Sequence, residues 1–148
     1  MRIARHTATA LAVASATAVL TGGLAGTAVA QASTPCGNSA EACVDLSSNQ
    51  AWLQDGAAIS YGPVPITTGK PGHATPPGWF KVSYKDRHHR SRAYHNAPMP
   101  YSVFFNGGIA FHAGSLEEQS HGCIHLSTGA AKTFFNDLQP GDPVEVVP

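Results

Sequence analysis

The sequence lacks an excess of charge of either sign, because nine lysines and arginines are matched by nine aspartates and glutamates. Proteins that bind nucleic acid through its phosphates carry a positive field, so this balance predicts that nucleic acid is not a partner. The sequence also lacks internal repeats, and its length suits one folded domain. Cysteine is scarce, and three residues allow at most one internal disulfide.

The first thirty residues have the pattern of a secretory signal peptide. Two arginines precede an uncharged run at residues 7–30, rich in Ala, Thr, Val, Leu and Gly, which ends in Ala-Val-Ala. A basic start, a weakly apolar middle and a small-residue exit are typical of such a peptide. A transmembrane anchor is the alternative, because the run is long enough to span a bilayer, but its composition argues against it. We expect cleavage after Ala30 or Ala32, secretion, and no stable membrane insertion of the mature chain.

Removal of this segment would leave about 116 residues, enough for one domain that buries roughly two thirds of its unfolded surface. We therefore divide the chain into a signal peptide at residues 1–30, a short segment at 31–42 and one domain at 43–148. Seven basic residues would remain against nine acidic ones, so the mature chain stays near neutral.

Two of the three cysteines are expected to pair with each other. Cys36 and Cys43 bracket a polar, turn-like segment, and export favours their oxidation to a disulfide. A lipid-anchored Cys36 is the alternative, but the preceding residues lack the apolar approach that such processing uses. Cys123 is then the unpaired thiol, and the reactivity of a free cysteine usually matters more than its packing.

The apolar pattern predicts a mostly β domain with one short α-helix. We expect strands at residues 44–46, 51–54, 57–60, 64–67, 79–84, 101–105, 109–112 and 144–147. Turn residues at 55–56 and 106–108 predict two hairpins, and the glycines and prolines of residues 67–78 predict a loop. Ser127 or Thr128 is expected to cap a helix that Pro140 and Gly141 stop. The preceding Ser-His-Gly-Cys would lie at its entrance, where helix N–H groups favour a thiolate.

The stretch SHGCIHLS at residues 120–127 holds the candidate chemistry. A free thiol is only a few per cent thiolate at neutral pH, so Cys123 needs a base or a positive environment. In an extended segment His121 would project to the same side as Cys123, and parallel neighbours do not easily point at each other. His112, from another strand, is the better base on geometry. The N–H groups of Gly122 and Cys123 could polarise the attacked carbonyl.

A metal site is the alternative for the same residues. His112, His121, Cys123 and His125 would supply four zinc ligands, and the last three alternate onto one face if the segment is extended. Structural zinc ligands usually come in paired short spacings, which argues against this arrangement. The residues alone leave a nucleophile, a metal site and a structural cluster open.

Three motifs in order resemble a known family. Ser120-His121-Gly122-Cys123, between a histidine-bearing strand and a strand end with a helix, resembles the signature of the L,D-transpeptidase catalytic domain, the YkuD-like family. VDLSSNQAWLQDG at residues 44–56 resembles its opening hairpin, and TTGKPGHATPPGWFKV at 67–82 resembles its TG...TP.G.F segment. The resemblance runs from about Cys43 to Val147.

The resemblance implies a sandwich-like or barrel-like β catalytic domain and a cysteine acyltransferase that acts on peptidoglycan in the cell wall. In such enzymes the thiolate attacks the third stem residue of a tetrapeptide, expels the terminal D-alanine and holds the stem as a thioester. An amine of a neighbouring stem then accepts the acyl group and forms a 3-3 cross-link. The resemblance implies acylation by carbapenems as well, and neither a metal nor another cofactor.

Carried over by position, Cys123 is the nucleophile and His112 the base, with the Ala113 carbonyl orienting the imidazole. The resemblance further implies that His121 and Gly122 shape the oxyanion site. Ser120 would support that site.

Two departures from the family pattern concern the site. The family usually has Arg or Asn two residues after the cysteine, whereas this chain has His125, which offers fewer donors and a charge that changes with pH. The link from His112 to Ser120 is also shorter than in many members. A smaller lid would admit water more readily, so an L,D-carboxypeptidase or endopeptidase that hydrolyses the same thioester is the alternative.

A basic segment, KVSYKDRHHRSR at residues 81–92, holds five basic residues, one aspartate and two histidines. Its positive charge could meet stem carboxylates or anionic wall polymers. A solvated loop with no binding role explains the composition equally well.

Overall fold

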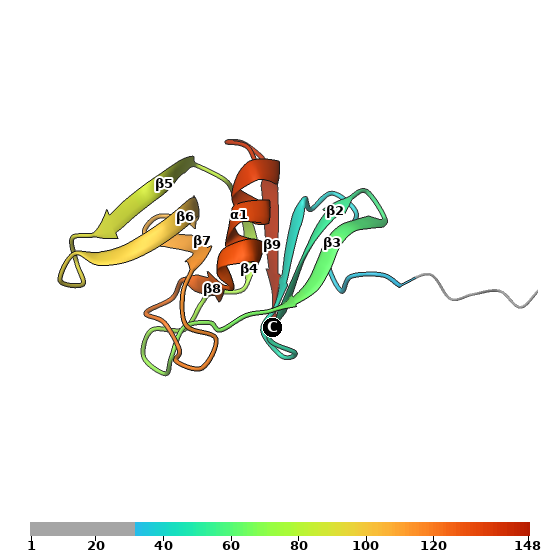
Figure 1. The fold of residues 1–148 in the computed structure, drawn as a ribbon. Helices are drawn as coiled ribbons and strands as arrows, with labels where there is room; N and C mark the ends of the chain where they lie inside the picture. Colours follow the sequence, from blue (N-terminus) through green and yellow to red (C-terminus); the bar gives the residue numbers. More distant parts are fainter. Residues whose placement is uncertain (1–31) are drawn as a thin grey trace, which may run out of the picture. The chain divides into compact units, whose positions relative to one another are not determined.

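The computed structural model describes residues 32–148, so the predicted signal peptide lies outside the described residues. These residues form two sheets and one helix (Figure 1). The first sheet has the strand order β3-β2-β1-β9-β4 and the second the order β5-β6-β7-β8. The elements are β1 (Ala42–Asp45), β2 (Gln50–Asp55), β3 (Ala58–Pro65), β4 (Gly78–Lys81), β5 (Tyr84–Ser91), β6 (Ala97–Asn106), β7 (Ile109–Ala113), β8 (Ile124–Leu126), α1 (Thr128–Asp137) and β9 (Pro143–Val147).

The predicted mostly β fold with one short helix is confirmed. Both predicted hairpins form, because β2 pairs antiparallel with β3 and β6 pairs antiparallel with β7. Ser127 is the cap of α1, and its Oγ accepts a hydrogen bond from the Ala130 N–H at 3.2 Å. Within residues 32–148 there is no helix of sufficient length and apolar character to cross a membrane.

The strand predicted at residues 79–84 is confirmed only for residues 79–81, since the chain changes sheets after Lys81. β4 ends at Lys81, and the N–H of Val82 donates to Asp142 O at 2.9 Å, next to β9 of the first sheet. The following N–H, from Ser83, donates to Phe104 O at 2.8 Å in the second sheet. The apolar pattern runs through this junction because Val82 is buried, with 2% of its surface exposed, so periodicity alone does not reveal the change.

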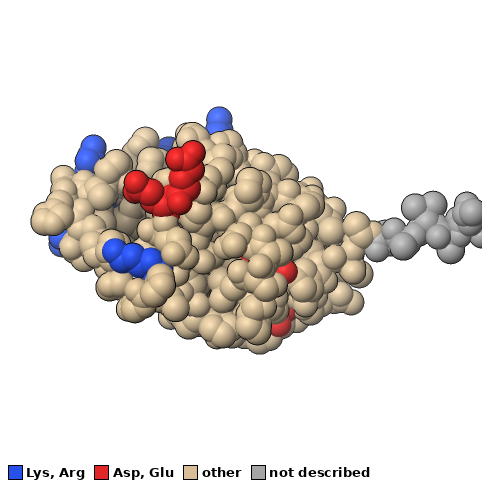
Figure 2. Space-filling view, turned by 90° about the horizontal axis from the view of Figure 1, so that it is seen from below, with Lys and Arg blue, Asp and Glu red and all other residues tan. Residues whose placement is uncertain are grey.

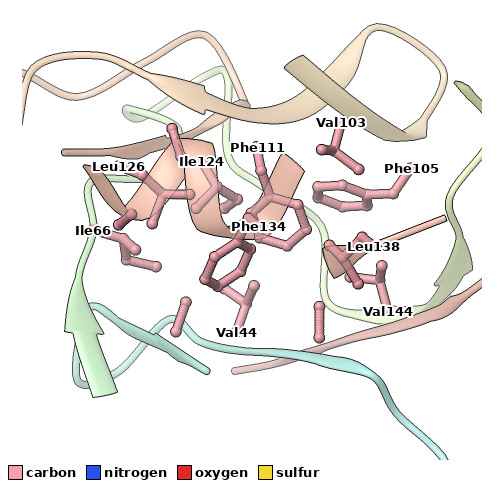
Figure 3. Close-up of a cluster of buried hydrophobic side chains, with 14 of the residues drawn as sticks. Val44, Ile66, Val103, Phe105, Phe111, Ile124, Leu126, Phe134, Leu138 and Val144 are labelled. Carbon is pink, nitrogen blue, oxygen red and sulfur yellow. The ribbon is translucent and has the colours of Figure 1, made fainter. Parts of the chain in front are cut away.

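The main core lies between the sheets and α1 (Figure 3). Phe134 of α1 is fully buried, and its ring centroid lies 5.0 Å from that of Phe111 on β7. Burial of one such side chain contributes about 1.5–3 kcal/mol. At the other end of α1, the Lys85 ammonium donates to the carbonyls of Phe135 and Leu138, which would otherwise lack helical partners. The helix is therefore fixed against β7 and β8, the strands that border the thiol.

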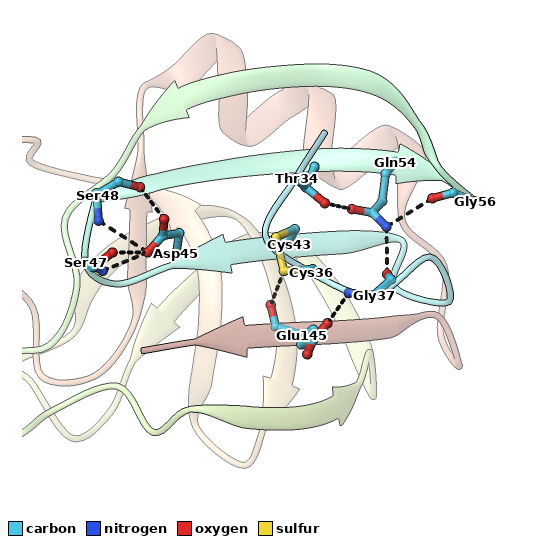
Figure 4. Close-up of a disulfide and its surroundings, with 10 residues drawn as sticks. All are labelled: Thr34, Cys36, Gly37, Cys43, Asp45, Ser47, Ser48, Gln54, Gly56 and Glu145. Atoms are coloured by element: carbon cyan, nitrogen blue, oxygen red, sulfur yellow. Dashed lines mark hydrogen bonds between the residues drawn. A yellow bond between two sulfur atoms is a disulfide. The ribbon is translucent and has the colours of Figure 1, made fainter. Parts of the chain in front are cut away.

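The predicted disulfide between Cys36 and Cys43 is confirmed (Figure 4). It packs with Trp52 in a small apolar cluster separate from the main core. Hydrogen bonds hold the same segment to the first sheet, since the Gly37 N–H donates to a Glu145 carboxylate oxygen at 2.7 Å. Cys123 is left as a free thiol, as predicted.

Candidate active site

A cleft of about 1170 Å³ lies on the second sheet and contains the free thiol. Its walls come from β5, β6, β7, the turn between β5 and β6, and the loop between β7 and β8. Figure 2 shows the face that carries the loops after β3 and β7, where acidic side chains gather in one place with lysine or arginine side chains around them. The lining includes Cys123, His112, His121, His125, Ala113 and Ser120.

Cys123 lies directly before β8, with its sulfur half-buried beside Met99, Phe104 and Ala110. The thiol donates a hydrogen bond to the Gly108 carbonyl, with sulfur and oxygen 3.6 Å apart. Burial raises the pKa of Cys123, and a hydrogen bond with the backbone of Ala110 offsets part of the rise. The raised pKa favours the protonated thiol over a preformed thiolate.

His112 on β7 is buried, with 6% of its surface exposed. Its Nδ1–H donates to the Ala113 carbonyl at 2.9 Å, which leaves Nε2 with the lone pair. The pKa of His112 is lowered to about 4, chiefly by burial and to a smaller extent by the charges of His125 and His89, while the hydrogen bond to Ala113 opposes the shift. At neutral pH the imidazole is uncharged and able to accept the proton of the thiol.

The Ser-His-Gly-Cys segment is a turn, so the predicted alternation of His121 and Cys123 along an extended segment is wrong. Gly122 has a φ of +120°, a conformation that favours glycine, and a Cβ there would lie 3.3 Å from Ile109 Cδ1. The Ser120 hydroxyl accepts from the Gly122 N–H at 3.0 Å and donates to the Cys123 carbonyl at 2.6 Å. Ser120 thus fixes the backbone on both sides of the thiol.

A short strand separates the thiol from the helix, contrary to the predicted position at the helix entrance. The three residues of β8 and the cap residue Ser127 stand between Cys123 and the first residue of α1. Because helix-terminal effects fade within the first turn, α1 does not account for the state of the thiol.

His121 is exposed, unlike the half-buried Cys123 and the buried His112. Its ring stacks on Tyr94, with centroids 4.2 Å apart, and meets the edge of His73 at 4.7 Å. Tyr94 belongs to the turn between β5 and β6, so this contact joins that turn to the Ser-His-Gly-Cys segment. Desolvation, together with the charges of Lys70 and His73, lowers the pKa of His121. His121 borders the cleft as part of a three-ring cluster.

The loop between β3 and β4 braces the thiol segment, a role that no sequence argument assigned. The Thr75 hydroxyl donates to the Gly122 carbonyl at 2.8 Å and accepts from the Gly69 N–H at 3.0 Å. Ser120 exchanges backbone hydrogen bonds with Thr68 and Lys70 at 2.9 and 3.0 Å. The available signal was the TG...TP pattern, in which these residues occur.

His125 on β8 lies against His112, with ring centroids 4.8 Å apart. Its Nδ1 is 3.1 Å from the Ser115 carbonyl and 3.2 Å from the Thr67 hydroxyl. A Cβ on Gly114 would come within 2.6 Å of the His125 ring, so glycine makes room for it. The residue that departs from the family pattern is thus held in a defined position beside the base.

The basic segment at residues 81–92 is largely β5, so its reading as a solvated loop is wrong. Lys85 bonds to the end of α1, and the Arg87 guanidinium lies 5.5 Å from the Tyr101 ring centre. By contrast, Asp86, His89, Arg90 and Arg92 line the cleft. The segment is thus divided between contacts with the end of α1 and Tyr101 and the wall of the cleft.

The metal alternative receives no support from the placement of its four residues. Within residues 32–148, no group of three or more His, Cys, Asp and Glu side chains is placed to hold a metal ion. His121 contacts the rings of Tyr94 and His73, whereas Cys123 packs against Met99, Phe104 and Ala110, so the two do not share the surroundings that the alternative required.

The fold and the cleft define a β-rich domain in which a cysteine and a neutral histidine line the same cleft, each hydrogen-bonded to a nearby backbone carbonyl. The family model of the L,D-transpeptidase catalytic domain, YkuD, matches residues 39–146. The chain therefore belongs to the L,D-transpeptidase catalytic domain family, as the motifs predicted.

Solved structures agree with this assignment. An L,D-transpeptidase from Stackebrandtia nassauensis is 31% identical, with a TM-score of 0.69, over 72% of this chain and 54% of that chain. The L,D-transpeptidase LdtMt1 in complex with imipenem is 25% identical, with a TM-score of 0.65, over 72% and 57% of the two chains. An L,D-transpeptidase from Mycobacterium tuberculosis H37Rv, 24% identical, shares the fold with a TM-score of 0.67, over 72% and 57%. This chain thus spans little more than half the length of these proteins, and no curated protein sequence matches it.

Proposed function

We propose that this protein is an exported L,D-transpeptidase that transfers acyl groups between peptidoglycan stems through a thioester on Cys123. One observation carries the proposal: the thiol shares a cleft with His112, whose Nδ1–H is committed to the Ala113 carbonyl. A neutral imidazole with a free Nε2 is the form that a general base requires. The family assignment supports the reaction, and the disulfide supports export because such bonds persist in oxidising compartments.

The first half-reaction begins from a neutral pair. His112 takes the proton of the Cys123 thiol as sulfur attacks the carbonyl of the third stem residue, so that no free thiolate accumulates. The Gly122 N–H is already bonded to Ser120, and stabilisation of the oxyanion therefore falls to the Cys123 N–H. The imidazolium then gives its proton to the nitrogen of the departing D-alanine, which leaves a thioester and a neutral His112.

Intact mass spectrometry tests this step directly. The mature protein is incubated with a carbapenem and with a tetrapeptide stem, and we expect a covalent adduct and release of D-alanine. The complex of LdtMt1 with imipenem supports the choice of probe. Cys123→Ala should form no adduct, whereas the double variant Cys36→Ala/Cys43→Ala retains Cys123 and should form one. An adduct on Cys123→Ala would falsify the proposal.

Hydrolysis is a second candidate outcome for the thioester. The loop at residues 114–119 is short and all six of its residues are exposed, so it offers little cover against water. A carboxypeptidase would release the free tripeptide, whereas a transpeptidase would give a 3-3 cross-linked dimer. Chromatography of the products from the same incubation separates the two.

A further inference from the structure

Besides His112, His121 and His125, a further imidazole faces the cleft and has no part in the first half-reaction. His89 lies on β5, in the same sheet as His112 on β7, with one strand between them. Both side chains line the cleft, and a charge on His89 lowers the pKa of His112, which shows that the two groups lie within electrostatic reach. Phe104 connects the two sides, because it meets the His89 ring at 4.8 Å and packs in the cluster that borders Cys123.

The orientation of His89 is fixed in the way that orients a catalytic imidazole. Its Nδ1 lies 3.1 Å from a carboxylate oxygen of Asp86, and Phe104 supports the ring from its edge. Because a carboxylate only accepts hydrogen bonds, Nδ1 carries the proton and Nε2 carries the lone pair. Asp86 is held in turn by the His88 N–H at 3.0 Å, and this hydrogen bond lowers the pKa of the Asp86 carboxyl group and keeps it charged.

Comparison with His88 shows that His89 is the histidine of this strand that lines the cleft. His88 is exposed and does not line the cleft, whereas 26% of the His89 side chain is exposed. Packing alone does not require an imidazole with a carboxylate partner at position 89, since an apolar residue would cover Phe104 as well. The pair of Asp86 and His89 therefore calls for a chemical explanation.

The second half-reaction, in which the acyl group passes from Cys123 to an amine, requires another base. An amine acceptor enters as an ammonium ion and ends as an amide nitrogen, so it loses two protons. One proton returns to the Cys123 sulfur through His112 as the thioester breaks. The other must leave before attack, because a protonated amine has no lone pair.

We propose that His89, positioned by Asp86, is the base that takes this first proton from the acceptor ammonium. The inference rests on the proposed transfer function and adds a catalytic residue to it. The His89 Nε2 accepts one proton, and the freed amine forms a carbon–nitrogen bond with the thioester carbonyl. His112 takes the second proton from the tetrahedral intermediate and gives it to sulfur as the carbon–sulfur bond breaks, and His89 later releases its proton to water. The other charged or titratable groups that line this cleft are Arg90, Arg92, Tyr84, Tyr94, His121 and His125.

The experiment separates the two half-reactions in His89→Gln and in the matched control His88→Gln. Acylation is followed by mass spectrometry as formation of the tetrapeptide adduct. Transfer is followed as consumption of that thioester by a stem amine between pH 6 and pH 10. General-base catalysis typically contributes 10²- to 10⁴-fold, so we expect His89→Gln to slow transfer about 100-fold near neutral pH, with acylation much less affected. The defect should shrink at high pH, where the acceptor is already deprotonated.

Asp86→Asn tests the positioning role. We expect a smaller loss of transfer than in His89→Gln, with the same recovery at high pH, because the amide leaves the imidazole present but less well oriented. An equal loss of both half-reactions in His89→Gln, a transfer defect unchanged by pH, or an equal defect in His88→Gln would overturn the inference. Absence of an adduct on the wild-type protein would instead overturn the proposed function.

Discussion

His112 and His125 occupy paired positions on the parallel strands β7 and β8, and their rings meet edge to face at 4.8 Å. Both Nδ1 atoms lie near backbone carbonyls, at 2.9 Å from Ala113 for His112 and at 3.1 Å from Ser115 for His125. Because the two imidazoles are so close, a proton on His125 opposes protonation of His112. The departure from the family pattern thus acts on the base itself.

Replacement of His125 should change the acid limb of the acylation rate. In His125→Asn the opposing charge is absent, so the pKa of His112 rises above about 4, while burial, the larger cause, still keeps it below the ordinary value of histidine. Since only neutral His112 accepts the thiol proton, we expect the midpoint of the acid limb to move to higher pH. The measurement is the rate of carbapenem adduct formation between pH 3.5 and pH 8, with exposed His88→Asn as control. Superimposable profiles for the three proteins would contradict the coupling.

The buried His112 should make stability depend on pH. The unfolded chain binds a proton on this histidine near pH 6.5, whereas the folded chain does so only near pH 4, so the unfolded state binds more protons between these values. Stability contributed by neutral His112 is therefore present above pH 6.5 and decreases as pH falls toward 4, by about 3 kcal/mol in total. Urea unfolding of wild type and His112→Gln at several pH values measures the difference. An equal loss in both proteins would show that other groups cause it.

Loss of the Thr75 hydroxyl should loosen the thiol segment. Thr75→Val keeps the shape but removes the donor to the Gly122 carbonyl and the acceptor for the Gly69 N–H, both inside the protein. An unpaired buried polar group costs about 1–3 kcal/mol, so we expect a loss of stability of this order together with slower acylation of Cys123. Thr75→Ser retains the hydroxyl and should lie close to wild type in both measurements. If Thr75→Val is destabilised but acylates Cys123 at the wild-type rate, the Thr75 hydrogen bonds contribute to stability and not to acylation.

Removal of the disulfide should affect stability and leave the cleft unchanged. Cys36 and Cys43 are seven residues apart, and a loop of this size is expected to contribute about 2–3 kcal/mol. Cys36→Ala/Cys43→Ala should therefore unfold at lower denaturant concentration and still acylate Cys123 under folding conditions, because its cluster is separate from the one that borders the thiol. Wild-type stability in this variant would contradict the expected contribution of the disulfide. Loss of acylation in the folded variant would contradict the expectation that the cleft is unchanged.

Local patterns predicted the elements that depend on neighbouring residues. The two hairpins follow from their turn residues, and the cap at Ser127 follows from its hydroxyl before an apolar stripe. The disulfide followed from the count of cysteines and from export chemistry. In each case the interacting groups are close in sequence or few in number, so little of the remaining fold is needed.

Patterns failed where distant strands decide the outcome. The junction at Val82 looks like one strand because burial continues across it, although its hydrogen bonds lead to different sheets. His121 was expected to project beside Cys123, but the chain turns at Gly122. The His121 ring stacks instead on Tyr94, which lies far from it in the sequence. For residues 81–92 the sequence left a binding role and a solvated loop open, and only the fold shows that part of β5 lines the cleft.

By itself the sequence determined the β-rich class, the free thiol at Cys123, and His112 as the candidate base, because strand periodicity, cysteine pairing and motif order are written along the chain. Only the tertiary structure decided that His112 is buried and neutral, that His125 lies against it, and that Asp86 and His89 share the cleft. Burial and electrostatic coupling depend on residues far apart in sequence, and folding alone brings those residues together.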